Sequence, residues 1–171
     1  MAVTSYHRLK ELGAHKLLQF DYAGFTNFLL AERTAAFRRY YIGAIREEEG
    51  NLKSKELMAA QRRLTGHLQN DGWEVMFGHM LKNRGVYQEK GVDVQIAVDL
   101  VVGAYENQFD AAIIISSDTD LIPAIAKVRS KGKTVEYVGF SKRPSYGLIA
   151  HADERRLLTR ADIAKFLPAE K

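Results

Sequence analysis

The chain has 171 residues, a hydrophobic content of 46% and no cysteine. This length suffices for one domain with a substantial core, and no apolar run approaches the ~20 residues that a bilayer-spanning helix needs. The lack of cysteine excludes disulfides, thiolate metal sites and cysteine catalysis, so a cytoplasmic location is the default expectation. The net charge of +4 leans mildly toward polyanionic partners.

Hydrophobic periodicity divides the chain into alternating helices and strands. We predict helices at residues 5–12, 22–33, 54–69, 93–107, 121–130 and 161–167, and strands at residues 39–45, 73–81, 111–116 and 134–139. Strands that are almost continuously apolar and alternate with helices are typical of a parallel, doubly wound α/β sheet. No linker or repeat interrupts the pattern, so we expect one domain over residues 1–171.

The segment AAIIISSDTDLIP at residues 111–123 carries the strongest functional signal. A buried strand ends abruptly in two hydroxyls and two carboxylates, at the edge where α/β sheets bind their ligands. Asp118 and Asp120 are two residues apart, so in an extended segment both could face one cation. Asp120 could instead cap the helix that begins at Leu121, whereas we see no such capping role for Asp118.

A third carboxylate, Asp93, opens the helix predicted at residues 93–107. On a helical wheel it lies on the apolar arc, whereas Asp99 lies on the polar arc. An inward-facing carboxylate needs a partner, either a bound cation or the positive end of its own helix dipole. Both interpretations of Asp93 stay open at this point.

Three converging carboxylates would repel one another unless a cation lay between them. Oxygen ligands suit Mg²⁺ or Mn²⁺ better than zinc, and the five histidines show no metal-ligand spacing. Such a metal can activate water and stabilise charge that develops on a phosphoryl group. The pattern therefore indicates phosphate chemistry.

The segments KGVDVQIAVDL (residues 90–100), FDAAIIISSDTDLIP (109–123) and GKTV (132–135) together resemble the NYN domain family, the LabA-like branch of the PIN-like nucleases. Weaker likeness extends to YYIG at residues 40–43 and to residues 144–153. The resemblance implies a PIN-like three-layer α/β sandwich, a carboxylate-bound Mg²⁺ or Mn²⁺, and cleavage of RNA.

Carried over by position, the resemblance implies catalytic roles for Asp93, Asp118 and Asp120. It adds Asp99 to these three as a metal ligand, which we rank last because of its place on the wheel. The candidates for RNA contact are Lys90, Ser117, Lys142 and Arg143.

The resemblance fails at the start of the chain, where the family has a strand that ends in an aspartate. Only MAVT precedes the helix predicted at residues 5–12, so that strand and its carboxylate are expected to be missing. We expect either that the start of the chain was assigned too late or that the protein is a non-cleaving member. Asp21 is a weak candidate to replace the missing ligand.

The leading hypothesis is a metal-dependent endoribonuclease, impaired by the missing carboxylate. The alternative is a non-catalytic RNA-binding or regulatory module on the same fold. A phosphohydrolase with an Asp118–Asp120 nucleophile and acid pair is the least favoured. We expect RNA as the partner and no association with a membrane. A homodimer is possible.

Overall fold

The computed structural model describes residues 2–5, 17–45, 50–83 and 86–168, and for residues 2–5 and 79–90 it describes the backbone alone. Its elements are, in chain order, β1 (Ala2–Ser5), the short 3-10 helix η1 (Leu17–Gln19), α2 (Tyr22–Leu30), β2 (Arg38–Gly43), α3 (Leu52–Asn70), β3 (Glu74–Asn83), β4 (Val86–Lys90), α4 (Val92–Tyr105), β5 (Ala111–Ile115), the 3-10 turn η2 (Thr119–Leu121), α5 (Ile122–Ser130), β6 (Thr134–Phe140), α6 (Tyr146–His151), β7 (Glu154–Leu158) and α7 (Arg160–Ala164).

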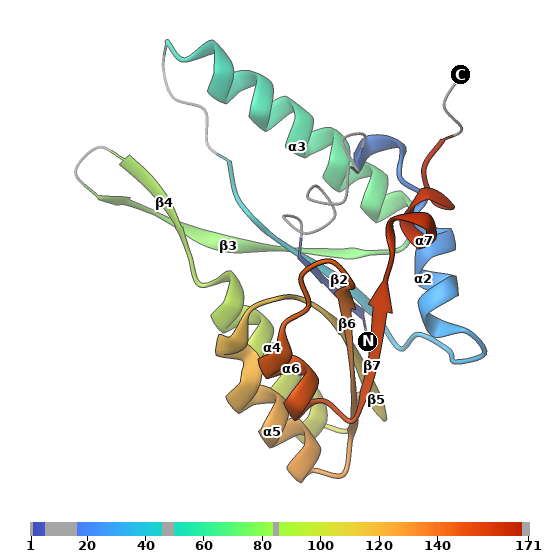
Figure 1. Cartoon of the computed structure of the whole chain (residues 1–171). Coiled ribbons are helices and arrows are strands. Elements are labelled where there is room, and N and C mark those ends of the chain that lie inside the picture. Colours follow the sequence, from blue (N-terminus) through green and yellow to red (C-terminus); the bar gives the residue numbers. More distant parts are fainter. Residues whose placement is uncertain (1, 6–16, 46–49, 84–85, 169–171) are drawn as a thin grey trace.

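The strands form one seven-stranded sheet in the order β4-β3-β2-β1-β5-β6-β7 (Figure 1). Every neighbouring pair is parallel except β3 and β4, which form an antiparallel hairpin that projects from the body of the protein. Because β2, β1, β5 and β6 run in one direction, the segments that follow them all leave at the same edge of the sheet. This is the edge at which doubly wound sheets bind ligands.

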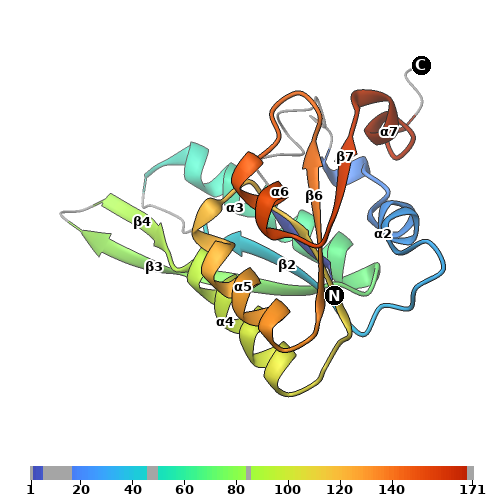
Figure 2. The same cartoon turned by 60° about the horizontal axis from the view of Figure 1, so that its bottom comes forward.

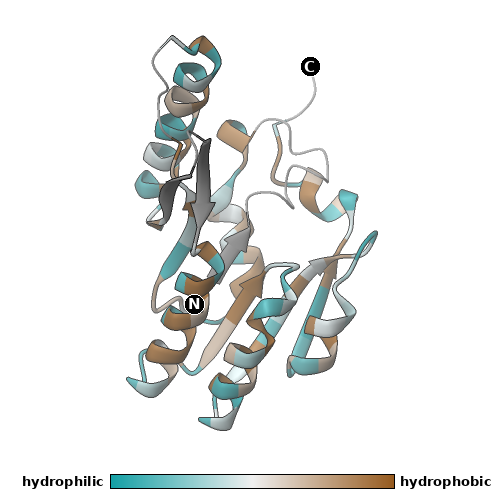
Figure 3. Cartoon of the chain, turned by 90° about the vertical axis from the view of Figure 1, so that its left-hand side faces the viewer, coloured by the Kyte–Doolittle hydropathy of each residue, from teal (hydrophilic) through white to brown (hydrophobic). Residues whose placement is uncertain are grey.

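Two hydrophobic cores lie on opposite faces of the sheet. One packs η1, α2, α3 and α7 against the strands, and the other packs α4, α5 and α6. Figure 2 shows the second group of helices side by side on their face, and Figure 3 shows that the strands between the layers are largely hydrophobic. Strand β5 supplies both cores by simple alternation: Ile113 and Ile115 join the first, and Ala112 and Ile114 the second.

These layers confirm the predicted mainly parallel, doubly wound α/β fold. Burial of successive β5 side chains on both faces explains why the strand reads as an unbroken apolar run in the sequence. The predicted helix at residues 5–12 is wrong at its first residue, because Ser5 ends β1, and residues 6–12 lie outside the described residues.

The expectation that the first strand is missing is wrong. Strand β1 is present, although only four residues long, and it occupies the centre of the sheet. It pairs in parallel with β2, where Thr4 lies opposite Tyr40, and with β5, where Thr4 lies opposite Ile115. The segment AVTS escaped the prediction because four residues give too few periods for a pattern, whereas two neighbouring strands supply the partners that its backbone groups require.

Three further elements, β4, α6 and β7, were not predicted. Helix α6 has only six residues, and β7, with the sequence ERRLL, is an edge strand whose first two residues are exposed. Elements this short, with one face in solvent, lack the apolar periodicity that marks a longer buried element. Tertiary packing, rather than local sequence, therefore determines them.

Candidate functional site

The acidic site begins where β5 ends. After Ile115 the chain passes through Ser116 and Ser117 and enters η2 at Thr119. The hydroxyl oxygen of buried Ser116 accepts a hydrogen bond from the backbone N–H of Asp118 at 3.1 Å. This contact turns the chain away from the strand direction and fixes the backbone that carries both acidic side chains.

Asp118 caps η2, because its Oδ1 accepts a hydrogen bond from the N–H of Asp120 at 2.9 Å. Asp120 lies inside the first turn of η2, and the cap position of α5 is Leu121, which has no side-chain cap. The expected capping roles are therefore reversed, since the chain begins to coil before Asp120. One oxygen of Asp118 has a backbone partner, and among the described residues no backbone amide donates to its other oxygen.

Asp93 lies in the first turn of α4, two residues after Gly91, whose left-handed φ of 84° allows the sharp passage from β4 into the helix. The pKa of Asp93 is raised, first by partial burial, then by the negative charge of Asp118 and a hydrogen bond shared with it, and then by the charge of Asp120. The carboxyls of Asp93 and Asp118 therefore lie close enough to share a hydrogen bond, and Asp120 lies close enough for its charge to act on Asp93. A shared role of the three acids stays a prediction.

The oxygen atoms of these carboxylates are suitable ligands for a hard divalent cation, but there are few of them. Carboxylate oxygens suit Mg²⁺ or Mn²⁺, and a cation would relieve the repulsion that raises the pKa of Asp93. However, within the described residues no group of three or more Asp, Glu, His or Cys side chains is arranged to hold a metal ion. Strand β1, which ends at Ser5 beside β5, contains no carboxylate that could complete such a group. Among the described residues, the acidic side chains therefore do not form a complete set of metal ligands.

Asp99 lies apart from this cluster, and its predicted position on the solvent face is wrong. Its side chain is only 14% exposed, and its two oxygens accept hydrogen bonds from Tyr41 Oη at 2.7 Å and from Gln95 Nε2 at 2.8 Å. The guanidinium of Arg39 lies 3.7 Å away. Asp99 therefore ties α4 to β2. Burial, and then the hydrogen bond to Asp99, raise the pKa of Tyr41.

Asp21, the weak candidate for the missing ligand, caps α2. Its Oδ1 accepts a hydrogen bond from the N–H of Gly24 at 2.7 Å, and its own N–H donates to the carbonyl of Phe166. Both contacts hold it between α2 and the segment after α7. The local cap accounts for this acid without a metal.

The candidates for RNA contact are only partly placed at the acidic edge. Lys142 and Arg143 are exposed in the turn after β6, the strand next to β5, and Ser117 is half-buried just before Asp118. Lys90 ends β4, and its side chain lies outside the described residues. Two exposed cations thus lie on the loop that neighbours the carboxylates.

The segment after this loop was missed by the sequence analysis. Helix α6 packs against η2 so closely that a Cβ on Gly147 would lie 3.0 Å from Cγ2 of Thr119. Tyr146, the first residue of α6, therefore stands next to the turn that carries Asp118 and Asp120, and its side chain is 78% exposed. The signal available in the sequence was Ser145 before a short apolar run, because serine is a common residue at helix starts.

A family model described as NYN domain matches residues 5–158. The chain belongs to the NYN domain family. This is a family of nuclease- and RNA-related domains, so the resemblance found in the sequence is confirmed.

A solved structure from Vibrio parahaemolyticus, a protein of unknown function, is similar to this NYN domain with a TM-score of 0.67 and 22% sequence identity. The match covers 92% of this chain and 90% of the Vibrio chain, and it supports the PIN-like, Rossmann-like fold. The comparison of this chain with curated proteins found no match. No helix in the described ranges is long and apolar enough to cross a membrane.

Proposed function

We propose that this single-domain protein is a metal-dependent endoribonuclease of the NYN type. The proposal is best supported by Asp93 and Asp118, which share a hydrogen bond near Asp120 where β5 ends at the carboxyl edge of the parallel sheet; burial and these neighbouring charges raise the pKa of Asp93. Family membership adds that domains of this kind are nuclease- and RNA-related. The proposed substrate is RNA, and a cytoplasmic location stays a prediction, as does a homodimer.

In this proposal Asp93, Asp118 and Asp120 hold Mg²⁺ or Mn²⁺, which when bound supplies an activated water and stabilises charge on the phosphoryl group. Asp118 contributes the oxygen that has no backbone bond, while the capped oxygen keeps its carboxyl oriented. Lys142 and Arg143 on the neighbouring loop attract the phosphate backbone of the RNA. Asp99, ranked last among the ligands, holds α4 against β2 and so positions the helix that carries Asp93.

The proposal is tested by cleavage of a labelled single-stranded RNA in Mn²⁺, comparing the wild-type protein with Asp118→Asn. An asparagine oxygen can still accept the hydrogen bond from Asp120, so the turn should survive while the ligand charge is lost. We expect cleavage to fall by about 100-fold or more, because a metal contributes several kcal/mol to phosphoryl chemistry. Melting temperatures of both proteins verify that the fold is kept.

Asp110→Asn is the matched control. Asp110 precedes the same strand, β5, at the opposite edge of the sheet, and its side chain is fully exposed. This variant should cleave RNA like the wild type. Equal cleavage by Asp118→Asn, or wild-type cleavage that persists in a chelator, would contradict the metal-dependent mechanism.

A second candidate function is a non-catalytic RNA-binding module. It is favoured by the lack of a carboxylate in β1 and by the lack of a three-ligand group among the described residues. For this function we expect RNA binding that weakens with salt and does not change with Mn²⁺ or a chelator. Such binding without any cleavage would show that the protein is a non-catalytic RNA-binding module.

A further inference from the structure

Where the loop after β6 enters α6, an aromatic ring faces solvent beside the turn that carries Asp118 and Asp120. Tyr146 is 78% exposed, and within the described parts of the chain its ring makes no hydrogen bond, aromatic contact or cation contact. Other exposed rings differ in this respect: Lys131 Nζ lies 3.9 Å from the ring centre of Tyr105, and the Arg156 guanidinium 5.5 Å from that of Phe28. Exposed Phe77 belongs to β3, which β2 and β1 separate from β5.

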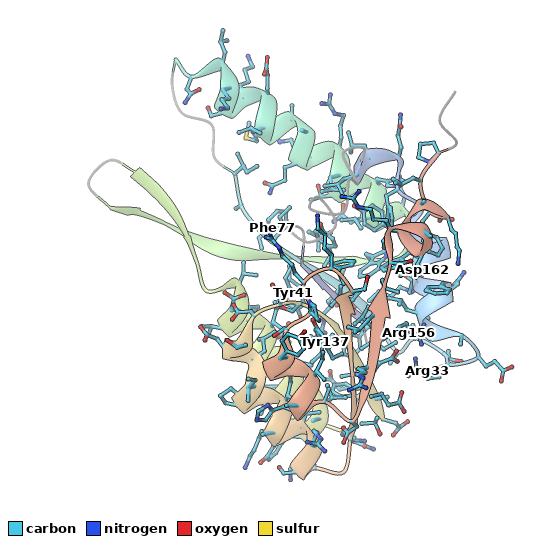
Figure 4. All side chains as sticks on the ribbon, viewed as in Figure 1. Arg33, Tyr41, Phe77, Tyr137, Arg156 and Asp162 are labelled. Carbon is cyan, nitrogen blue, oxygen red and sulfur yellow. The ribbon has the colours of Figure 1, made fainter. Side chains whose placement is uncertain are left out.

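The backbone beneath Tyr146 is held firmly. On one side, the N–H of Ser145 donates to the hydroxyl of Tyr137, a buried side chain of β6, at 3.0 Å. On the other side, fully buried Leu148 anchors α6 in the core, and Gly147 lies against Thr119. Figure 4 shows Tyr137 beside α6, beneath this loop. The ring of Tyr146 thus stands on a fixed base, so little backbone freedom is lost when a ligand packs on it.

The surroundings of Tyr146 match the chemistry of a nucleic acid strand. Lys142 and Arg143 on the same loop are exposed and can pair with phosphates, while Asp118 and Asp120 lie on the adjoining turn. Tyr146 follows the loop that carries these cations and starts the helix that contacts the acidic turn, so its exposed ring is available to a base of a strand whose backbone passes the carboxylates. Stacking of a base on an aromatic ring is the usual way in which proteins hold unpaired nucleotides.

We propose that Tyr146 is the stacking platform for one unpaired nucleobase of the RNA that passes the acidic site. This inference rests on the proposed function, because it takes the bound polymer to be RNA. In a duplex the faces of the bases are stacked on their neighbours and cannot reach the ring. Tyr146 therefore selects unpaired segments, while Lys142 and Arg143 attract both forms.

The test measures binding of the full chain to a short fluorescein-labelled oligoadenylate and to a matched duplex, in a chelator so that the RNA stays intact. Tyr146→Phe keeps the ring and should bind the single strand like the wild type. Tyr146→Ala and Tyr146→Leu should bind it roughly 5- to 100-fold more weakly, the usual effect of losing one stacked base. Duplex binding should be unchanged in all three variants.

An aminopurine base in the single strand gives a direct readout, because its fluorescence is quenched when it stacks. The wild type and Tyr146→Phe should quench it, and Tyr146→Leu should not. As the matched control, Lys142→Ala should weaken single-strand and duplex binding alike and reduce the salt dependence by about one unit of slope.

The outcomes separate this inference from the function on which it rests. If the wild type binds and Tyr146→Leu binds equally well with full quenching, the stacking role is wrong, while RNA binding stands. If the wild type binds neither RNA, the proposed function falls, and the stacking role with it. Wild-type binding without cleavage, combined with weak binding by Tyr146→Leu, supports the platform and the non-catalytic function.

Discussion

At the scale of single residues, the ionisation of Asp93 couples the acidic site to stability. Its pKa is raised by burial and by the neighbouring charges of Asp118 and Asp120, so the folded protein holds this proton more tightly than the unfolded chain does. Folding is unaffected by this group below the ordinary aspartate pKa of about 4, where both states are protonated. As the pH rises through the raised pKa, ionisation of Asp93 costs stability.

Asp93→Asn should therefore stabilise the metal-free protein at neutral pH and lose this advantage below about pH 4. Because Asp93 is largely exposed, solvent screening keeps the effect small, and we expect a rise in melting temperature of about 1–3 °C. Thermal unfolding at several pH values measures it, with Asp110→Asn as a control that should not change. A lower melting temperature at neutral pH would show that the three carboxyls do not repel one another.

The same experiment repeated in Mn²⁺ tests the cation directly. A bound cation stabilises the folded state in proportion to its affinity, so Mn²⁺ should raise the melting temperature of the wild type. Asp93→Asn, which lacks one ligand, should respond less. Equal responses in both proteins would exclude Asp93 as a ligand.

Residue types and their place in the chain indicated which acids to examine but not their contacts. Asp118 and Asp120 stood out because they follow the apolar run of β5, and Asp93 because it is the first acid of the helix after β4. Which acid caps the turn depended on where η2 begins, and the burial of Asp99 depended on the packing of β2 against α4. Both depend on tertiary packing, which a helical wheel does not represent.

At the scale of elements, buried Glu136 on β6 connects three pieces that the sequence places far apart. It pairs with Arg156 on β7 at 3.0 Å and with Arg33, which follows α2, at 2.5 Å. Arg33 also donates to the carbonyls of Leu29 and Leu30 at the end of α2. Figure 4 shows Arg33 and Arg156 on the side of the sheet that α2 covers.

We expect Glu136→Gln to lower the free energy of unfolding by about 1–3 kcal/mol. The amide removes the charge that both guanidinium groups share and turns an N–H₂ toward one of them. Urea unfolding measures the change, with Glu154→Gln as the matched control, since exposed Glu154 lies opposite Glu136 in the register of β6 and β7. An equal effect in both variants would contradict the role of the buried pair.

Long, buried elements were predictable and short or edge elements were not. Helix α3 and strand β5 have periodic or continuous apolar sequences, and their predicted bounds agree with the structure within about two residues. Helix α6 and strand β7 are defined instead by what they pack against, Thr119 in one case and β6 in the other. The platform residue Tyr146 lay in this unpredicted part.

At the scale of the whole molecule, β1 joins the two halves of the sheet. Strands β4, β3 and β2 lie on one side of it, and β5, β6 and β7 on the other. The acidic site draws on both halves, because α4 and Asp93 follow β4, whereas Asp118 follows β5. The relative position of these carboxylates therefore depends on the four residues of β1, which join the two halves.

Thr4→Pro should destabilise the protein severely, by about 3 kcal/mol or more, because proline removes a ladder hydrogen bond from a central strand. Thr4→Val, which keeps the backbone N–H, is the control and should remain folded. Circular dichroism and urea unfolding distinguish the two. A proline variant as stable as the wild type would show that β1 does not hold the sheet together.

The central place of β1 also constrains how the protein is made. Of the two strands that flank β1, β5 is synthesised only after more than a hundred residues have followed β1. Until then β1 can bond on one side at most, with its other edge open to unrelated chains. We therefore expect the nascent chain to need protection from aggregation, for example by a chaperone, until β5 has been synthesised.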